Sequence, residues 1–552
     1  MKNQIFPALL SLFLLFFLSC SSDSGEETPQ PDTQAPTVDF NIAGATSSGS
    51  TPIVVSNEII INVDARDAGG VAKVEAFIDD QKVGEDTSAP YQIVIDVTGF
   101  ESKLAQTSKF KNYTLKITVT DTSGNTSSKE QLINIENKTP LITINFPPNQ
   151  PLNSDIVEFY VFASSLNGEV LGIERVQTND TSIILSTTAS FSSTDMFMLT
   201  FAELNDLGIA RFSTISNLTT GSLPEINLDT YPQYELRPGN QSFQATGFDT
   251  LSDIVLSGFG IAYIASIDYS SFNSVQIDRF ECVSCDDVSS DFLYLTMKDS
   301  EVPYRYLTLD WDTAEDFIFT PNLFTDQGLE NRTIQMNKAS GLPIDYTNFR
   351  LVGYFGQNDF ENNFYHLIDT GKSSAPDNLN STYIFNDIFD QYSYEVTIDG
   401  YYTNRIGIPV SSVTTLDWTL DYTVSERNIS IEKNSTNEVL GKVILGSQIV
   451  DANYIPYSWE LIFDSQLANE VNIPEIPEEI KSWEFYDAFS TRDLQVRQVE
   501  IKRYENIIDF NDYLEKIISS NKRPFSVSNT IESIFLNSES NIHGAVDDWL
   551  VD

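Results

Sequence analysis

Two of the three cysteines in the chain, Cys282 and Cys285, are separated by only two residues. A C-x-x-C pair serves redox chemistry, zinc binding or a short structural disulfide. Zinc would need a second set of thiol or imidazole ligands, and the sequence does not supply one at a suitable spacing. Carboxylates flank the pair at Glu281 and Asp286, and their negative charge opposes the thiolate that redox catalysis requires. We therefore predict a structural disulfide between Cys282 and Cys285 at the tip of a β-hairpin.

The other candidates for catalysis are histidines and carboxylates. The two histidines, His366 and His543, stand in no H-E-x-x-H motif, and no G-x-S-x-G motif supplies a nucleophile. Glycosidases use two carboxylates about 5–9.5 Å apart, and Asp310 and Asp312 flank Trp311 as two acids beside a sugar platform would. The opposite interpretation, with Trp311 in the core and both acids in water, is favoured. No catalytic residue is therefore assigned.

Cofactor and metal motifs are equally scarce. The sequence has no phosphate-binding loop, dinucleotide fingerprint or EF-hand, so we predict no cofactor. Asp64, Asp67 and Asp121 offer oxygen ligands that suit Ca²⁺, but no loop has the alternating ligands of a dedicated site. Their place in turn sequences favours a role in stabilising those turns, and we predict no metal site.

The charge balance restricts the partners of the chain. Its 552 residues contain 79 acidic and 32 basic side chains, which gives a net charge of −47. Neutralising nucleic-acid phosphates requires clustered Lys and Arg, so nucleic acid is excluded as a partner. Hydrophobic residues make up 41%, enough for packed cores, and at about 100–200 residues per domain the length indicates three or four domains.

The first twenty residues have the pattern of an export signal. Lys2 precedes an almost unbroken apolar run over residues 5–18, which is shorter than the ~20 apolar residues of an ordinary transmembrane helix. The run ends at Ser19-Cys20, and an acidic, Ser-rich segment follows directly. The pattern predicts that the protein leaves the cytoplasm.

The end of this signal resembles the lipobox of bacterial lipoproteins, although Phe17 stands where the motif usually has Leu. The resemblance implies that Cys20 is lipidated, that the preceding peptide is removed, and that acyl chains anchor the protein in the outer membrane. The acidic residues after Cys20 resemble the export signal of Bacteroidota-type surface lipoproteins. That second resemblance implies exposure at the cell surface.

Short alternating strands with turn signals between them fill residues 37–137. Over residues 113–119, for example, every second residue is apolar and would face one side of a sheet. About seven such strands in ~100 residues predict a β-sandwich of the immunoglobulin (Ig) type. The runs at 64–71 and 113–125 resemble bacterial Ig-like domains, which implies a module that spaces or stacks other modules.

Beyond residue 137 the pattern stays β-rich but resembles no family. Residues 308–311 recur as residues 415–418, which indicates either two related subdomains or chance. Near the end, Asp509 is a predicted N-cap and Pro524 a predicted stop for a helix with an apolar stripe. We thus predict a mainly β chain: an Ig-like β-sandwich, further β-sandwich-like domains and a small α+β C-terminal unit. The predicted divisions are a signal peptide at 1–19, a tether at 20–36, the Ig-like domain at 37–137, a β-rich domain at 138–235, a β-rich region at 236–470 and the α+β unit at 471–552.

These features favour a lipid-anchored outer-membrane surface protein that binds a neutral glycan or a protein. Two alternatives stay open. One is a surface polysaccharide hydrolase that uses paired carboxylates, and the other is an accessory structural lipoprotein of an outer-membrane complex. Enzymatic activity is the less favoured hypothesis, because no catalytic motif is present.

The anchoring hypothesis predicts the behaviour of a single variant. Replacing Cys20 by Ala removes the sulfur that would carry the diacyl group, so we expect an unprocessed or soluble precursor that is not labelled by radioactive palmitate. Membrane fractionation together with palmitate labelling measures this. A variant that still partitions with membranes as the wild type does would contradict the lipoprotein hypothesis.

Overall fold

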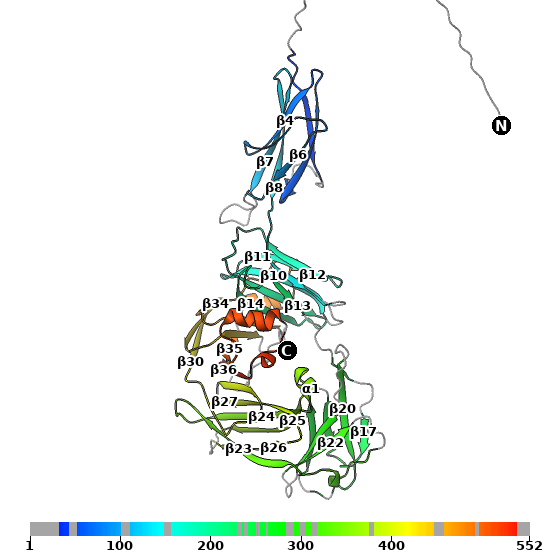
Figure 1. Cartoon of the computed structure of the whole chain (residues 1–552), viewed down its shortest axis with the longest axis vertical. Coiled ribbons are helices and arrows are strands. Elements are labelled where there is room, and N and C mark those ends of the chain that lie inside the picture. Colours follow the sequence, from blue (N-terminus) through cyan, green and yellow to red (C-terminus); the bar gives the residue numbers. More distant parts are fainter. Residues whose placement is uncertain are drawn as a thin grey trace, which may run out of the picture. The chain divides into compact units, whose positions relative to one another are not determined.

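The computed structural model describes most of the chain as two compact units, residues 1–137 and 138–552. The described residues are 32–43, 52–100, 111–147, 156–228, 234–236, 241–249, 251, 254–260, 263–282, 292–298, 304–310, 317–374, 380–446, 457–491, 496–520 and 522–537. Among them, no helix is both long and apolar enough to cross a membrane. The fold is mainly β, as the sequence predicts, and helices are short (Figure 1).

The first unit is a sandwich of two sheets around one core. Each strand presents alternate residues to that core, and in β7 the residues Tyr113, Leu115, Ile117 and Val119 are all buried. The predicted alternation is therefore confirmed. One sheet contains β1 (Thr37–Ile42), β3 (Glu58–Arg66) and β6 (Gln92–Asp96); the other contains β2 (Ile53–Val55), β8 (Thr126–Ile135), β7 (Asn112–Asp121), β4 (Val71–Ile78) and β5 (Gln81–Asp86).

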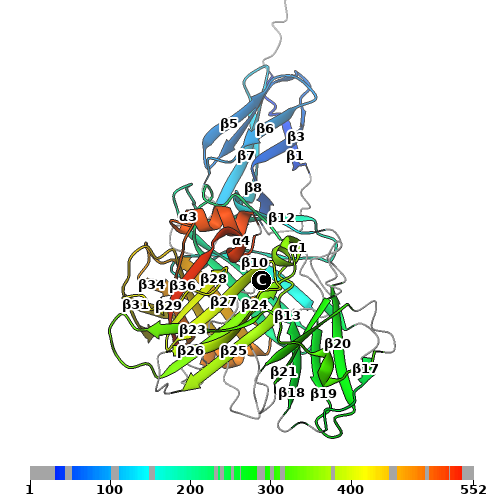
Figure 2. The same ribbon diagram turned by 60° about the horizontal axis from the view of Figure 1, so that its bottom comes forward.

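The second unit is built on one long sheet of nineteen described strands, most of them antiparallel (Figures 1 and 2). Its strands are β10 (Ile156–Ser165), β11 (Val170–Arg175), β13 (Phe197–Asn205), β14 (Ala210–Leu218), β16 (Tyr234–Leu236), β17 (Gln241–Gln244), β18 (Val255–Gly260), β19 (Tyr263–Ile267), β20 (Ser274–Cys282), β21 (Phe292–Lys298), β22 (Arg305–Asp310), β24 (Tyr346–Tyr354), β25 (His366–Ser374), β27 (Gln391–Ile398), β28 (Tyr401–Ile406), β32 (Leu440–Gly446), β33 (Tyr457–Asp464), β35 (Val496–Tyr504) and β36 (Thr530–Asn537).

Three small sheets and several short helices complete the described part of this unit. The sheets are β12 (Ser182–Thr187) with β9 (Thr139–Asn145) and β15 (Glu225–Asn227), β26 (Asn380–Asn386) with β23 (Leu329–Asn337) and β29 (Ser412–Thr414), and β30 (Thr419–Ser425) with β31 (Asn428–Asn434) and β34 (Glu470–Asn472). The helices are η2 (Pro321–Leu323), α1 (Gln357–Glu361), α2 (Phe485–Thr491), α3 (Phe510–Tyr513), η3 (Leu514–Ser519) and α4 (Pro524–Val527).

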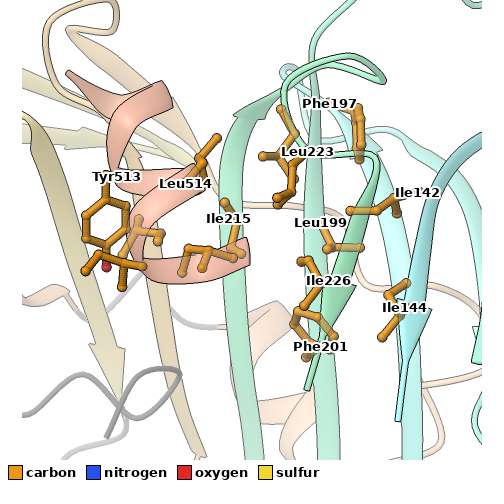
Figure 3. Packing of buried hydrophobic residues seen from close by; sticks show 14 of the residues in the cluster. Ile142, Ile144, Phe197, Leu199, Phe201, Ile215, Leu223, Ile226, Tyr513 and Leu514 are labelled. Carbon is orange, nitrogen blue, oxygen red and sulfur yellow. The ribbon is translucent and has the colours of Figure 1, made fainter. Parts of the chain in front are cut away.

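The small sheets cover the faces of the long one. In β10, Val161 and Ala163 pack in a core with the β9 sheet and the α3–η3 helix, whereas Tyr160 and Phe162 pack in a second core with β31 and α2. Figure 3 shows the first core, where Ile142 and Ile144 of β9 lie opposite side chains of β13 and the helix. Because both faces of β13, β14, β32 and β33 are covered, most residues in these strands are buried, rather than every second one.

The sheet crosses the domain divisions that we predict at residues 235 and 470. The strand β14 pairs in parallel with β33, and β32 and β28 pair with β35 and β36. Residues 138–552 form one compact unit, and residues 1–137 form the other. Alternation of apolar and polar residues indicates which face of a strand is buried, but it does not indicate which distant strand pairs with it.

Local features of the C-terminal region agree with the sequence. The Asp509 side chain accepts a hydrogen bond from Asp512 N at 2.8 Å, as an N-cap does, and the predicted apolar stripe is buried. The helix is α-helical for one turn and continues as a π-helix over Leu514–Ser519. The repeated tetrapeptide has no common structure, because Thr308–Asp310 lie in β22 whereas residues 415–418 lie between strands.

One buried carboxylate in the sheet makes stability depend on pH. Glu203 of β13 is 8% exposed and lies opposite Arg211. Burial raises the pKa of Glu203 to about 7, although Arg211 opposes this shift. Below the unfolded-state pKa, near 4.3, the group is protonated in both states. As the pH rises toward 7 the unfolded chain ionises first, so stability falls.

The variant Glu203→Gln has no ionisable group at this position, so it lacks this loss of stability at higher pH. From pH 4 to pH 8 we expect the wild type to lose about 3 kcal/mol of unfolding free energy relative to the variant, measured by urea unfolding at each pH. Glu330→Gln, a change at an exposed carboxylate, is the control and should follow the wild type. If the stability of the wild type and of Glu203→Gln changed with pH in the same way, the pKa of Glu203 would not be raised in the folded protein.

Candidate ligand-binding pocket

The predicted cysteine sites lie outside the described side chains. Cys282 is the last residue of β20, and Cys20 and Cys285 fall outside the described residues. The disulfide and the lipidation therefore remain predictions. Asp310 ends β22, while Trp311 and Asp312 also fall outside the described part of the chain, as does His543.

His366 has a structural environment. It is 2% exposed at the start of β25, and its Nδ1 lies 3.0 Å from the Tyr263 hydroxyl oxygen. Burial lowers the pKa of His366 to about 3, so the ring is neutral at physiological pH. The Tyr263 hydroxyl donates to the Tyr294 carbonyl at 2.9 Å, so the histidine belongs to a buried network that joins β19, β21 and β25.

Two of the three aspartates considered for Ca²⁺ come together in the first unit. Candidate ligand oxygens of Asp67 and Asp121 lie within 4.8 Å of each other and of Asp32, whereas Asp64 pairs with Arg66 at 2.8 Å. These are oxygen ligands of the type that Ca²⁺ prefers.

All three carboxylates of this cluster also accept hydrogen bonds from nearby backbone amides. Gly69 N donates to Asp67 at 2.7 Å, and Gln34 N donates to Asp32 at 2.9 Å. Burial acts to raise the pKa of Asp121, but hydrogen bonds from the Asn125 side chain and from backbone amides outweigh it, and the pKa is lowered. Those bonds fix the turn after β7, in agreement with the predicted turn role.

A pocket of about 540 Å³ lies in the second unit, where β14, β33 and the α3–η3 helix end or begin. Its polar lining comes from the segment after β14, from the end of β33 and from the exposed side of the helix. Part of its apolar lining comes from the side chains of Leu223 and Phe510, which belong to the core drawn in Figure 3. The lining residues are Met196, Asn217, Thr219, Ser222, Leu223, Pro224, Asp464, Leu467, Phe510, Asn511, Glu515 and Ser519.

Local sequence fixes the wall that β14 contributes. Asn217 has a φ of 59°, a left-handed conformation that Asn tolerates better than most residues. Its Oδ1 accepts a hydrogen bond from Asp464 N at 3.1 Å, which ties the ends of β14 and β33 together. Thr219 and Ser222 then hydrogen-bond each other in both directions, with Thr219 N donating to Ser222 Oγ at 2.9 Å and Ser222 N donating to Thr219 Oγ1 at 3.1 Å.

Two carboxylates provide the formal charge of the lining. Asp464 is half-buried, and its Oδ1 accepts hydrogen bonds from Gln466 N at 2.9 Å and Leu467 N at 3.1 Å. Burial raises the pKa of Asp464, nearby Asp509 adds to the rise, and the two backbone hydrogen bonds oppose it. Glu515 is exposed on the helix. Neither Lys nor Arg is among the lining residues.

This lining can hydrogen-bond hydroxyl groups. Carboxylates accept, amides of Asn217 and Asn511 both donate and accept, and the apolar lining offers contact area. Anions would meet negative charge without a cation among the lining groups. The sequence analysis missed these residues because each of them has the character of an ordinary turn or helix-surface residue.

Residues 45–119 match the family model of a bacterial Ig domain, so the resemblance predicted for the first unit is confirmed. The match covers only this part of the chain. No curated protein sequence matches the chain.

Several solved structures resemble parts of the fold. The chain is 18% identical to the fibronectin(III)-like modules of Clostridium thermocellum CbhA, over 18% of this chain and 98% of that one, with a TM-score of 0.13. It is 15% identical to a Ca²⁺-stabilised adhesin with which an Antarctic bacterium binds ice, over 69% and 100%, with a TM-score of 0.17. It is 12% identical to the Bacteroides ovatus protein SGBP-B of a mixed-linkage glucan utilization locus, over 63% and 92%, with a TM-score of 0.13.

The pocket wall gives a prediction about Asn217. Asn217→Ala loses the hydrogen bond to Asp464 N and places a Cβ-bearing residue without a local hydrogen bond in left-handed backbone, whereas Asn217→Gly loses only the hydrogen bond. We expect both variants to be less stable than the wild type, with Ala about 1 kcal/mol below Gly. Thermal and urea unfolding measure this. Equal stability of the two variants would show that the left-handed conformation is not maintained.

Proposed function

We propose that the protein is a lipid-anchored outer-membrane surface protein that binds a neutral glycan or a protein ligand. The observation that carries this proposal is the pocket beside β14, β33 and the α3–η3 helix, whose polar groups are amides, hydroxyls and two carboxylates. The predicted lipid on Cys20 would provide the anchor, and the predicted tether at 20–36 would give the binding region its reach.

Electrostatics support a neutral ligand. With a net charge of −47, the protein would repel sulfated or uronic-acid polymers within a Debye length of ~8 Å. Inside the pocket, Asp464 and Glu515 would repel an anionic group again. A ligand rich in neutral hydroxyl groups is repelled neither by the net charge nor by the pocket carboxylates. It can use the amide and carboxylate groups as hydrogen-bond partners.

The bacterial Ig domain supports the same arrangement. Domains of this kind mostly space or stack other modules, and in this chain the domain stands between the tether and the second unit. In the accessory-lipoprotein alternative, its outer faces would instead dock on a membrane complex.

One observation supports the hydrolase alternative. Asp464, whose pKa burial raises, shares the pocket with a second carboxylate, Glu515. A glycosidase requires such a pair, with one group held protonated as the acid. Asp464 also caps a turn through Oδ1, a structural role that accounts for its position without catalysis.

A glycan array tests the binding function directly. We expect the mature protein to retain an unmodified neutral glycan and to bind sulfated polymers poorly. Asn511→Ala combined with Glu515→Ala removes two exposed pocket groups, and we expect a Kd about tenfold weaker or more, because each lost hydrogen bond contributes roughly 1 kcal/mol. Asn331→Ala, a change at an exposed amide on β23, is the matched control.

The outcomes separate the hypotheses. Unchanged glycan binding by the double variant would place binding elsewhere on the protein. Steady release of reducing ends that is lost in Asp464→Asn would establish the hydrolase. Retention of proteins of the outer membrane without any glycan would favour the accessory role.

A further inference from the structure

A row of side chains crosses four adjacent strands on one face of the long sheet. Phe259 of β18 lies directly opposite Ile264 of β19, and the two residues are 41% and 43% exposed. On the other side of β18, where β25 begins, the centroid of the Tyr365 ring lies 6.2 Å from that of the Phe259 ring. The Arg350 guanidinium of β24 lies over the Tyr365 ring, 4.6 Å from its centroid. These four residues, the cross-strand row, do not line the pocket described above.

The row is apolar at positions where a half-buried strand ordinarily carries polar residues. In β18, Phe259 is exposed, whereas Gly258 and Gly260 on either side of it are buried. The Tyr263 ring fills the space beside both glycines, and a Cβ atom at Gly260 would lie only 2.7 Å from its Cε1. The core beneath β18 is thus filled without Phe259. Single exposed apolar residues are common, but the contiguous apolar side chains of the row indicate a binding surface.

Hydroxyl and amide groups border the row. Ser257 and Ser266 lie opposite each other, two residues from the Phe259–Ile264 pair and on the same face, and both are exposed. Gln276 of β20 lies opposite Ser266 and is exposed as well. A ligand that covers the rings would therefore have hydrogen-bond donors and acceptors at its edge.

The charges at the row favour an uncharged ligand. Arg350 Nη1 lies 3.1 Å from Glu395 Oε1, so the positive charge next to the Tyr365 ring is balanced within the sheet. Asp278 of β20 lies opposite Ile264 at the other end of the row. An anionic ligand would be repelled by Asp278 and by the net charge of −47. A ligand that carries hydroxyl groups and no negative charge therefore fits the row and its border.

Size distinguishes a glycan from a protein partner. Three steps of about 4.8 Å between four strands give the row a length of about 14 Å. A stable protein interface buries about 800 Å² on each partner, far more than four side chains offer. A pyranose ring has C–H groups on its faces and hydroxyl groups around its edge. A few linked sugars can therefore stack on Phe259 and Tyr365 while their hydroxyl groups reach the polar border.

We propose that the cross-strand row is a second binding site, separate from the pocket, on which the sugar rings of a neutral glycan chain stack. The proposal rests on the proposed function for its class of ligand, but it does not require binding in the pocket. Two sites for one glycan chain would strengthen retention, because the second contact is intramolecular once the first has formed.

Calorimetric titration of the mature protein with neutral oligosaccharides tests this site. The probes are cellohexaose, maltohexaose and mannohexaose, and each is titrated into the wild type and into the pocket variant with Asn511→Ala and Glu515→Ala. We expect at least one probe to bind both proteins. Adding Phe259→Ala and Tyr365→Ala to the pocket variant should weaken the Kd for that probe about tenfold or more, because two stacking rings are lost. Tyr269→Ala in the same background, a change at an exposed aromatic outside the row, is the matched control and should leave the Kd unchanged.

Stacking requires a ring at position 259, so Phe259→Trp should bind the probe at least as tightly as its parent. Thermal unfolding checks that each variant is folded; if Tyr365→Ala unfolds the protein, Phe259→Ala alone should weaken the Kd about threefold or more.

Several results would overturn the second site. They are no binding of any probe to the pocket variant, an unchanged Kd in the row variant, equal weakening by Tyr269→Ala, or weakening by Phe259→Trp as large as that by Phe259→Ala. If a probe binds the wild type but not the pocket variant, the glycan binds only in the pocket, so this proposal fails while the proposed function stands.

Discussion

The parallel pairing of β14 with β33 is the interaction on which the second unit depends. It brings Ala210–Ile215 alongside Tyr457–Ile462, and Trp459 stacks on Phe212 with ring centroids 4.6 Å apart. Trp459 Nε1 also donates to Thr214 Oγ1 at 2.8 Å, so a buried indole is both packed and hydrogen-bonded. Without this pairing, both cores of the sheet would lose a wall. The pocket would lose its shape too, because Asp464 meets Asn217 only where these two strands end together.

For strands with one covered face, the sequence predicts which residues are buried. For strands with two covered faces, the sequence indicates only that the region is rich in β-structure. In β7 the alternation identifies each core residue, whereas β13 reads Phe-Met-Leu-Thr-Phe-Ala and is buried throughout. Patterns formed by residues close in the sequence also predicted local structure correctly. The Asp509 cap is one example. What the sequence lacked was the partner of each strand, and the domain divisions at 235 and 470 depended on that information.

The same limit explains why the pocket was not predicted. Asn217, Asp464 and Asn511 come from three distant segments, and each has the local character of a turn or helix-surface residue. Asp32 is a similar case, because it stands in a polar segment and meets Asp67 and Asp121 only through the fold of the first unit. His366 is the opposite case, because its residue type suggested catalysis but the structure gives it a structural role. Burial within a network of tyrosines keeps its ring neutral.

The β14–β33 pairing also constrains how the protein acquires its fold. The two strands are separated by more than 200 residues, so the ends of a very long loop must meet before either core can close. Contacts of such high sequence separation slow folding. The first half of the second unit therefore has to persist with β14 paired only to β13 until the β33 segment becomes available, and during that interval the other edge of β14 is open to other chains. Once closed, the arrangement has the opposite property: a cut in the intervening chain would leave two fragments held together by the sheet itself.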